Sequence, residues 1–469
     1  MTPTLVAVIP ERLAPILHQV RPLAARFDDA GHRVYLVGGI VRDLVLGRPL
    51  SGDIDLTTDA LPEQTVAVVR GWADAVWDQG ARFGTVGLKK GDITFEVTTH
   101  RAEAYVPESR KPHVSFADDI EADLSRRDFT VNAMALQVTG SPDDAPALID
   151  PFGGVADLAA GVLRTPLEPE VSFSDDPLRM LRAARFVAGY GLEPAPGLVA
   201  AVEQLVNRLE IVSAERVRDE LCKLMVVDEP SRGLWFLVDT GLADVILPEL
   251  PAMRVEQDPI HHHKDVLAHT IAVVAKTSPE LIVRMAALLH DVGKPKTRSF
   301  GPKGVSFHHH EVVGARMARD RLRALRFPNE QIDAITQLVY LHLRFHGYGD
   351  DAWSDAAVRR YVRDAGPLLD KLNELTRCDC TTRNERKARM LSARMDALEA
   401  RIVELREREE LEAIRPDLDG DAVMAHLGIG PGREVGEALA MLLEARLEEG
   451  PLGDAEAYRR LDEWWAARG

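Results

Sequence analysis

The chain has 469 residues, of which 46% are hydrophobic, 28% are charged and 6% are aromatic, and its net charge is −17. This length exceeds one ordinary domain, so we expect three or four units, mostly helical. No apolar run approaches about 18 residues, which excludes a membrane-spanning helix. The acidic total alone argues against a nucleic-acid partner, although local basic clusters matter more than the sum.

The chain has three cysteines, Cys222, Cys378 and Cys380. An odd and sparse set indicates a reducing compartment, so we expect a cytoplasmic protein. Cys378 and Cys380 do not form a C-x-x-C pair, and we interpret both as packing or surface thiols.

The segment from Val34 to Thr58 predicts a strand, a glycine turn and a short helix. Val34–Val37 is a β-rich apolar run, Gly38-Gly39 interrupts it, and the next apolar residues recur with helical spacing until Gly47. The N-terminus of such a helix presents unpaired backbone N–H groups to an anion.

A second strand follows, in which Asp53 and Asp55 share one face because side chains alternate along a strand. Two carboxylates side by side repel each other unless a cation lies between them, and hard oxygen ligands suit Mg²⁺ or Mn²⁺. A phosphate cradle beside paired carboxylates predicts nucleotidyl transfer with two metal ions. The alternative is a plain Gly-Gly turn followed by a solvated D-x-D.

Further along, we expect a helix over Pro62–Trp77 and a hairpin of strands over Gly80–Leu88 and Ile93–Thr99. Glu96 on the second strand is either a third carboxylate near the metals or a solvent-facing side chain. Arg101–Val114 is polar and contains proline, so we expect a mobile loop.

The doublet Arg126-Arg127 precedes a predicted buried strand over Val131–Val138. Guanidinium groups match phosphate oxygens, so the doublet is a candidate triphosphate-binding element, and Asp128 is placed to orient an arginine.

Asp176 precedes a predicted helix that carries Arg179, Arg182 and Arg185 three residues apart. An aspartate acceptor beside an arginine donor can meet the Watson–Crick edge of cytosine or adenine, whereas guanine and uracil present the wrong order of groups. The alternative is an ordinary basic helix with an acidic cap. Ser213 is expected to cap the next helix, in which Glu215, Arg216 and Glu220 are expected as internal braces.

Four ordered motifs resemble the class II tRNA nucleotidyltransferase and poly(A) polymerase family. They are Gly38-Gly39-x-x-Arg42-Asp43, Asp53-x-Asp55, Arg126-Arg127-Asp128-Phe129-Thr130 and Asp176-x-x-Arg179. The resemblance implies an α+β fold, with a polymerase-β-like head of small mixed sheet plus helices and an all-α neck. It also implies template-independent addition of CCA to tRNA from CTP and ATP.

By this match, Asp53 and Asp55 are catalytic and hold Mg²⁺, and Asp176 and Arg179 read the base with support from Arg182 and Arg185. The residues implied to contact the triphosphate are Gly38, Gly39, Arg42 and Arg127. Family members often have glutamate at the position of Asp175, which is therefore left out of the base-reading pair. Poly(A) addition shares these motifs, although the Gly80–Val86 segment looks more like the CCA-adding side.

A histidine-rich region follows. His269 lies in a predicted helix over Asp265–Lys276, His290-Asp291 ends another, and His310, His342 and Asp379 come later. Imidazole and carboxylate groups on separate helices can converge on a metal such as Mn, Fe, Ni, Co or Zn. The region resembles the HD metal-dependent phosphohydrolase superfamily. The resemblance implies ligands His269, His290, Asp291 and Asp379, and places His310, with His342 as a further candidate, at a second metal.

The remaining chain is charged and helical. Leu391, Met395, Leu398, Ile402 and Leu405 step through two heptads, which predicts either an antiparallel helix pair or the seam of a homodimer. We therefore expect a head at 1–165, a neck at 166–255, an HD-type metal domain at 256–382 and a helical tail at 383–469.

Overall fold

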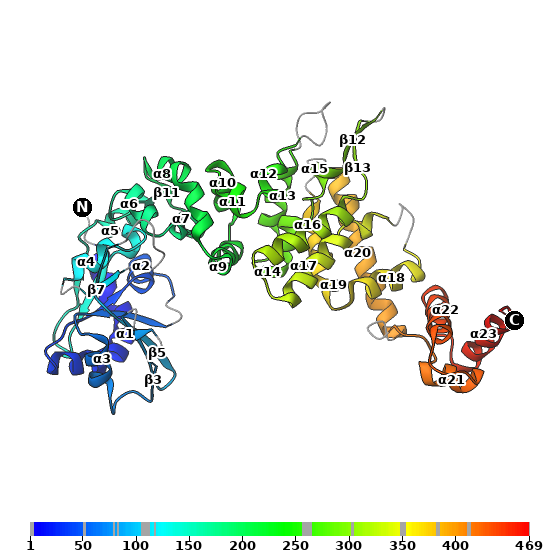
Figure 1. The fold of residues 1–469 in the computed structure, drawn as a ribbon, viewed down its shortest axis with the longest axis horizontal. Helices are drawn as coiled ribbons and strands as arrows, with labels where there is room; N and C mark the ends of the chain where they lie inside the picture. Colours follow the sequence, from blue (N-terminus) through cyan, green and yellow to red (C-terminus); the bar gives the residue numbers. More distant parts are fainter. Residues whose placement is uncertain are drawn as a thin grey trace. The chain divides into compact units, whose positions relative to one another are not determined.

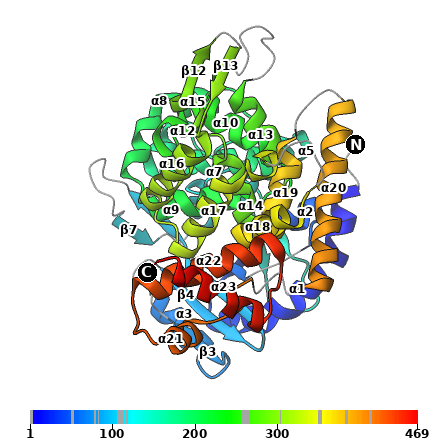
Figure 2. The same cartoon turned by 90° about the vertical axis from the view of Figure 1, so that its right-hand side faces the viewer.

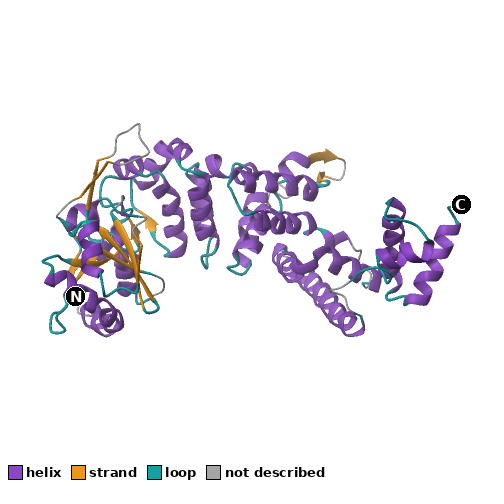
Figure 3. Cartoon of the chain, turned by 60° about the horizontal axis from the view of Figure 1, so that its bottom comes forward, coloured by secondary structure: helices purple, strands orange, loops and turns teal. Residues whose placement is uncertain are grey.

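The computed structural model describes residues 4–49, 53–77, 80–81, 84–104, 113–116, 119–255, 265–301, 304–347, 353–380, 385–409 and 414–468. The chain divides into two compact units, Met1–Ile246 and Leu247–Gly469 (Figure 1). Figure 3 shows that the large sheet belongs to the first unit and that helices dominate the second. The expected α+β class is confirmed. None of the described helices is both long and apolar enough to cross a bilayer.

The first unit is built on a sheet with the strand order β3-β4-β5-β2-β1-β8-β9. Its strands are β1 Val34–Val37, β2 Ile54–Thr58, β3 Ala75–Trp77, β4 Thr85–Lys90, β5 Ile93–Thr99, β8 Ala135–Val138 and β9 Ala147–Ile149. Within this sheet, as far as the structure describes it, β2 and β5 pair in parallel and the other neighbours are antiparallel. All four residues of β1 are buried, which explains why its sequence is apolar without alternation.

Helices cover this sheet and extend beyond it. The helices before β9 are α1 Thr4–Asp29, α2 Gly39–Leu46, α3 Pro62–Val69 and α4 Ile120–Ser125. Those after it are α5 Gly154–Ala160, α6 Pro169–Asp175, α7 Leu178–Gly189, α8 Leu198–Leu205, α9 Ala214–Met225, α10 Ser231–Asp239 and α11 Leu242–Ile246. Helix α7 packs on α9 and α10. Ser213 caps α9, as predicted, by accepting a hydrogen bond from the backbone N–H of Arg216 at 3.4 Å.

Three expectations about local structure are wrong. The helix expected over Pro62–Trp77 ends at Val69, and Ala75–Trp77 instead forms β3, because its backbone pairs with β4 at the sheet edge. The segment expected as a loop contains β6 Arg101–Ala104, which pairs with β7 His113–Phe116; residues 105–112 lie outside the described part of the chain. The strand expected from Val131 begins instead with a 3₁₀ turn over Thr130–Asn132, and only β8 joins the sheet.

The second unit contains twelve described helices and one hairpin. The helices are α12 Glu249–Ala252, α13 Val266–Lys276, α14 Leu281–Leu289, α15 Lys294–Thr297, α16 His310–Ala324, α17 Asn329–Leu341, α18 Asp355–Ala365, α19 Leu369–Asp379, α20 Glu385–Arg408, α21 Gly420–Leu427, α22 Arg433–Glu449 and α23 Asp454–Ala466. The hairpin is β12 Arg298–Gly301 with β13 Gly304–Phe307 (Figure 2). Helix α14 is central, because it contacts α13, α16, α17 and α19.

The predicted heptad residues lie inside this unit. Met395, Leu398, Ile402 and Leu405 are at most 3% exposed, and their helix α20 packs on α18 and α19 of the same chain. The helix-pair alternative therefore accounts for the pattern, and the homodimer stays a prediction. The last three helices form a separate small core around Val423, Leu442 and Leu461.

Candidate active site and metal centre

Two acidic side chains face the same side of the sheet in the first unit. Asp55 on β2 and Glu96 on β5 are direct register partners across the parallel strand pair, and Asp53 lies just before β2. Partial burial raises the pKa of Asp55, and Glu96 and Asp53 raise it further, against a lowering by Arg127. Such mutual repulsion is relieved when a divalent cation is bound, so the donor set fits one.

These carboxylates line a pocket of about 390 Å³ together with a group of arginines. The predicted site residues on its wall are Asp55, Glu96, Arg127, Asp176, Arg179 and Arg182. The wall also contains Asp128, Arg126 and Arg216, which the sequence had singled out for other roles, and Thr85, Thr98 and Arg101, which had no sequence signal. Gly38, Gly39, Arg42, Asp53 and Arg185 are not among the lining residues.

Gly38 lies between an arginine and a carboxylate of this pocket. Its φ is 74°, and a Cβ atom there would lie 3.2 Å from Arg127 Nη1 and 4.0 Å from Asp55 Oδ2. Glycine therefore satisfies both the left-handed backbone and the space that these two side chains occupy.

The arginine doublet is held by a buried aspartate that sequence reasoning missed. Asp123 on α4 pairs with Arg127 at 3.2 Å and with Arg126 at 3.3 Å. Burial works to raise the pKa of Asp123, but the two guanidinium groups outweigh it and hold the pKa below its usual value. The carboxylate thus stays charged and fixes both arginines at the pocket.

Arg42 lies behind the pocket and joins three elements. Its guanidinium donates to Asp43 and, at 2.8 Å, to Asn132 Oδ1, and it lies 4.2 Å from the centre of the Tyr190 ring. These contacts connect α2, the turn after Phe129 and the end of α7. Arg42 is 7% exposed, so in this structure it acts on the pocket through its neighbours.

The candidate base-reading pair is already hydrogen-bonded. Asp176 Oδ2 lies 2.9 Å from Arg216 Nη2, and its Oδ1 accepts from the backbone N–H of Leu178. Arg179 Nη1 donates to Ser172 Oγ at 2.9 Å, and its Nη2 donates to the backbone carbonyl of Arg126. Arg179 is therefore oriented by two contacts, one with Ser172 on α6 and one with the backbone of Arg126 in the arginine doublet.

Two buried acids hold the other arginines of α7. Arg182 Nε donates to Asp128 Oδ2 at 2.8 Å, and Arg185 Nε donates to Glu220 Oε2 at 2.8 Å. Burial raises the pKa of Asp128, but Arg182 above all lowers it to a net value below normal. Asp128 thus orients an arginine, and Glu220 is an internal brace, as the sequence predicted.

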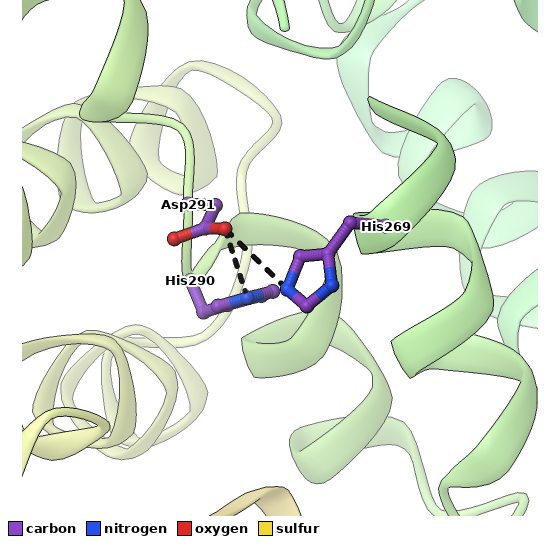
Figure 4. Close-up of side chains that lie close together, drawn as sticks. All are labelled: His269, His290 and Asp291. Carbon is purple, nitrogen blue, oxygen red and sulfur yellow. Dashed lines mark ion pairs between the residues drawn. The ribbon is translucent and has the colours of Figure 1, made fainter. Parts of the chain in front are cut away.

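The second unit brings its six predicted metal-binding residues into one cluster, and Figure 4 shows three of them, His269, His290 and Asp291. Asp291 Oδ2 lies 3.3 Å from His290 Nε2 and 3.6 Å from His269 Nε2, while its Oδ1 lies 3.3 Å from His310 Nε2 and 3.9 Å from His342 Nε2. Asp379 Oδ1 lies 2.9 Å from His269 Nε2. Among the described residues, ligand atoms within 4.8 Å of one another form two trios, which share Asp291.

Backbone carbonyls fix the orientation of three of these imidazoles. Nδ1 of His290, His310 and His342 lies 2.6–2.8 Å from a carbonyl oxygen three residues earlier. The carbonyl can only accept, so Nδ1 of each ring donates a proton to it and each Nε2 faces the cluster. Burial works to lower the pKa of His290, but Asp291 and Asp379 outweigh it and raise the pKa to about 10, so Nε2 of His290 must lose a proton to bind a metal. Burial and the neighbouring His290 lower the pKa of His342 to about 3, which keeps that ring neutral.

The consecutive histidines before α16 also differ in their exposure to solvent. His310 is 7% exposed, whereas the His309 side chain is 83% exposed. A close approach fixes this register, because a Cβ atom on Gly293 would lie 2.2 Å from the backbone oxygen of His310. Lys294 Nζ lies 2.6 Å from Asp291 Oδ2, so a cation already contacts the shared carboxylate.

Comparison with known proteins gives matches over most of the chain. The models described as poly(A) polymerase head domain, probable RNA and SrmB-binding site of polymerase A, and HD domain match residues 34–164, 191–253 and 262–409. The chain is 34% identical to the A-adding tRNA nucleotidyltransferase of Deinococcus radiodurans, over 92% of this chain and 95% of that one. It is 37% identical to the CCA-adding enzyme of Geobacillus stearothermophilus, over 51% and 56%.

A solved structure is similar over nearly the whole length. The Bacillus stearothermophilus CCA-adding enzyme in complex with CTP matches with a TM-score of 0.70 and 26% sequence identity. The match covers 97% of this chain and 98% of that one.

Proposed function

This chain belongs to the tRNA nucleotidyltransferase and poly(A) polymerase family, and we propose that it adds cytidine, cytidine and adenosine to the 3′ end of tRNA from CTP and ATP. The relatives named above are a tRNA nucleotidyltransferase and a CCA-adding enzyme, and in this proposal the addition uses no nucleic-acid template. The observation that carries the proposal is a single pocket whose wall holds the carboxylates Asp55 and Glu96, the aspartate–arginine pair Asp176 and Arg179, and further arginines.

In the proposed reaction, the 3′-hydroxyl oxygen of tRNA bonds to the α-phosphorus as the bond from that phosphorus to pyrophosphate breaks, and the hydroxyl proton is released. Asp53 and Asp55, with Glu96 beside them, would hold divalent ions, which we take to be Mg²⁺. When bound, such ions align the attacking and leaving oxygens and stabilise their charge. Arg127, fixed by Asp123, binds the triphosphate at the space left by Gly38 and Gly39, and Arg42 positions this region.

The incoming base is read by Asp176 and Arg179. The carboxylate accepts from the amino group of cytosine or adenine, and the guanidinium donates to the ring acceptors beside it. Uracil and guanine would instead place a carbonyl oxygen, which accepts, against the Asp176 carboxylate, and a ring N–H, which donates, against the Arg179 guanidinium. Arg182 and Arg185 support this pair through Asp128 and Glu220.

The two relatives named above differ in the nucleotides that their names give, one adding A and the other CCA. A tRNA that ends before CCA and a second tRNA that already ends in CC distinguish the outcomes when each is incubated with CTP alone, ATP alone and both. Two cytidines with CTP, completed by one adenosine with ATP, are expected for CCA addition. Adenosine addition only to tRNA that already ends in CC would restrict the activity to the last step, and an unlimited adenosine tail on any RNA would indicate a poly(A) polymerase.

The segments keep their predicted roles in this proposal: head at 1–165, neck at 166–255, metal domain at 256–382 and tail at 383–469. The partners are tRNA, CTP and ATP. Cytoplasmic location rests on the cysteine set, which is free of disulfides in the described residues. A homodimer is a further prediction that a sedimentation measurement would test.

A second candidate function is favoured by the histidine cluster. His269, His290, Asp291 and Asp379 would hold one transition metal, such as Mn, Ni, Co, Fe or Zn, and Asp291 with His310 and His342 a second. Such ions, when present, stabilise charge on a phosphoryl group. In phosphoester hydrolysis a water oxygen bonds to phosphorus, the ester P–O bond breaks, and the water proton leaves with the alcohol. Hydrolysis with Mn²⁺ or Ni²⁺ that His290→Ala abolishes, with nucleotide addition intact, would support this function.

A further inference from the structure

A short hairpin connects the two halves of the histidine cluster. Strand β12 begins directly after α15, whose Lys294 contacts Asp291, and β13 ends at Phe307, just before His310. The carbonyl of Phe307 lies 2.8 Å from His310 Nδ1, and Lys294 Nζ lies 5.7 Å from the centre of the Phe307 ring. The base of the hairpin is therefore tied to the cluster on both strands.

The far end of this hairpin carries an exposed aromatic ring. Phe300 is 71% exposed, the highest value among the large hydrophobic side chains of the described residues. Its backbone pairs with Val305, and the guanidinium of Arg298 lies 4.8 Å from the centre of its ring. Figures 1 and 2 show the hairpin extending away from the helices of its unit. A ring held in water on a paired strand is available to stack against a flat partner.

The hairpin is basic within an acidic chain. Between Asp291 and Glu311 the sequence holds no aspartate or glutamate, although the whole chain has a net charge of −17. Lys294 lies at the base, and Lys296 and Arg298 lie between it and Phe300. Neither Lys296 nor Arg298 has an ion pair with any residue that the structure describes. Local positive charge of this kind attracts a polyanion.

An aromatic ring flanked by unpaired cations is how proteins bind single-stranded nucleic acid, with bases stacked on the ring and phosphates beside the cations. A lone exposed ring is too small a hydrophobic surface for a stable protein interface, which buries far more apolar area. These features favour a nucleic acid over a protein partner.

The distance along β13 relates the exposed Phe300 ring to the metal cluster. Val305, the partner of Phe300, precedes Phe307 by two residues, which corresponds to about 7 Å along the strand. We infer that the β12–β13 hairpin is a stacking platform for single-stranded RNA, on which Phe300 holds a base and presents a neighbouring phosphate to the histidine cluster. The presentation of a phosphate to the cluster rests on the proposed phosphohydrolase function and names its substrate class, whereas the stacking of RNA on Phe300 does not depend on that function.

The test uses the full chain and a hexauridylate RNA that contains 4-thiouridine. Photo-crosslinking followed by peptide mapping should place the RNA on residues 298–307. Phe300→Ala should raise the RNA concentration at half-maximal crosslinking roughly 5- to 150-fold, whereas Phe300→Trp should retain it, because stacking needs only an aromatic face. Met390→Ala, which removes another half-exposed hydrophobic side chain, is the matched control and should have no effect. Replacing Lys296 and Arg298 by alanine should make the plot of the log binding constant against the log salt concentration less steep, by about 0.7 for each lost phosphate contact.

Crosslinks confined to other peptides, or a Phe300→Ala variant that crosslinks as the wild type does, would overturn the inference. The inference would also be overturned if Phe300→Ala lost binding to anionic phospholipid vesicles while its RNA crosslinking stayed unchanged, because the partner would then be a membrane. Hydrolysis of p-nitrophenyl phosphate with Mn²⁺, a substrate without a nucleobase, is measured separately. If that hydrolysis is absent while the crosslink forms at Phe300, the phosphohydrolase proposal fails and the RNA platform stands.

Discussion

Arg216 Nη2 lies 2.9 Å from Asp176 Oδ2, so the acceptor proposed to meet the incoming base is already paired with a cation from another helix. The pair is partly open to solvent, with the Arg216 side chain 53% exposed, and such pairs contribute little to stability. Its expected importance is therefore the orientation of the Asp176 carboxylate in the pocket.

Arg216→Ala should leave the protein folded but raise the KM for CTP and ATP. A loss of about 1 kcal/mol of base recognition corresponds to roughly a fivefold change. The measurement is steady-state incorporation into tRNA, with the melting temperature as a check on folding. Arg216→Lys keeps the charge but not the planar fork and should recover only part of the loss. An unchanged KM in Arg216→Ala would show that Asp176 needs no partner.

Asp128→Asn should destabilise the first unit, because Arg182 would lose the nearer of its two buried acidic partners. Removing one member of a buried pair costs about 3–5 kcal/mol, and the partial exposure of Arg182 places the expected value near about 3 kcal/mol. Urea unfolding measures this loss. Asp74→Asn breaks an exposed pair with Lys90 at 2.9 Å and is the matched control, with little change expected. Equal midpoints for the two variants would contradict the assigned role of Asp128.

The first unit should lose stability in acid. The pKa values of Asp123 and Asp128 are below the ordinary 3.8 in the folded protein, because their arginine partners outweigh the effect of burial. A carboxyl with a lowered folded pKa stabilises the fold above its unfolded pKa, and this contribution is lost as the pH falls through the folded pKa. Urea midpoints should therefore fall below about pH 4. Asp123→Asn should be less stable at neutral pH and show a shallower decline; the same decline as wild type would refute this account.

The histidine cluster should bind metal ions through its two trios of ligand residues, which share Asp291. Mn²⁺ or Ni²⁺ should raise the melting temperature of the wild type, since a ligand that binds only the folded state stabilises it. Asp291→Asn should abolish this gain, and His310→Ala should reduce the bound metal measured by elemental analysis. His309→Ala is the matched control, because that side chain is 83% exposed next to His310. A His309 variant that loses as much metal as the His310 variant would contradict the assigned ligand set.

The structural features that depend on short stretches of sequence could be predicted. The strand, glycine turn and helix from Val34 and the capping of α9 by Ser213 follow from neighbouring residues alone, and all are present. Asp128 was expected to orient an arginine and Glu220 to act as a brace, whereas two other braces, Asp123 and Ser172, were not predicted. Asp123 was missed although it precedes Arg126 and Arg127 by three and four residues, a spacing that brings side chains together on a helix, and Ser172 reaches Arg179 through the turn between α6 and α7.

The strand β3 shows the same limit on a smaller scale. Its residues Ala75–Trp77 fit a helical pattern, but pairing with β4 at the sheet edge supplies backbone hydrogen bonds that local sequence does not reveal. The face shared by Asp55 and Glu96 likewise depends on a parallel pairing between strands that are distant in sequence.

The central claim is that acidic groups on β2 and β5 form the nucleotidyl-transfer centre of this chain. The most direct test is the incorporation of CTP and ATP into tRNA that lacks its CCA end, by Asp55→Ala compared with Asp92→Ala, which removes an exposed acid between β4 and β5. We predict that Asp55→Ala abolishes incorporation while its melting temperature stays near that of the wild type, and that Asp92→Ala is active. Incorporation by Asp55→Ala at the wild-type rate would contradict the claim.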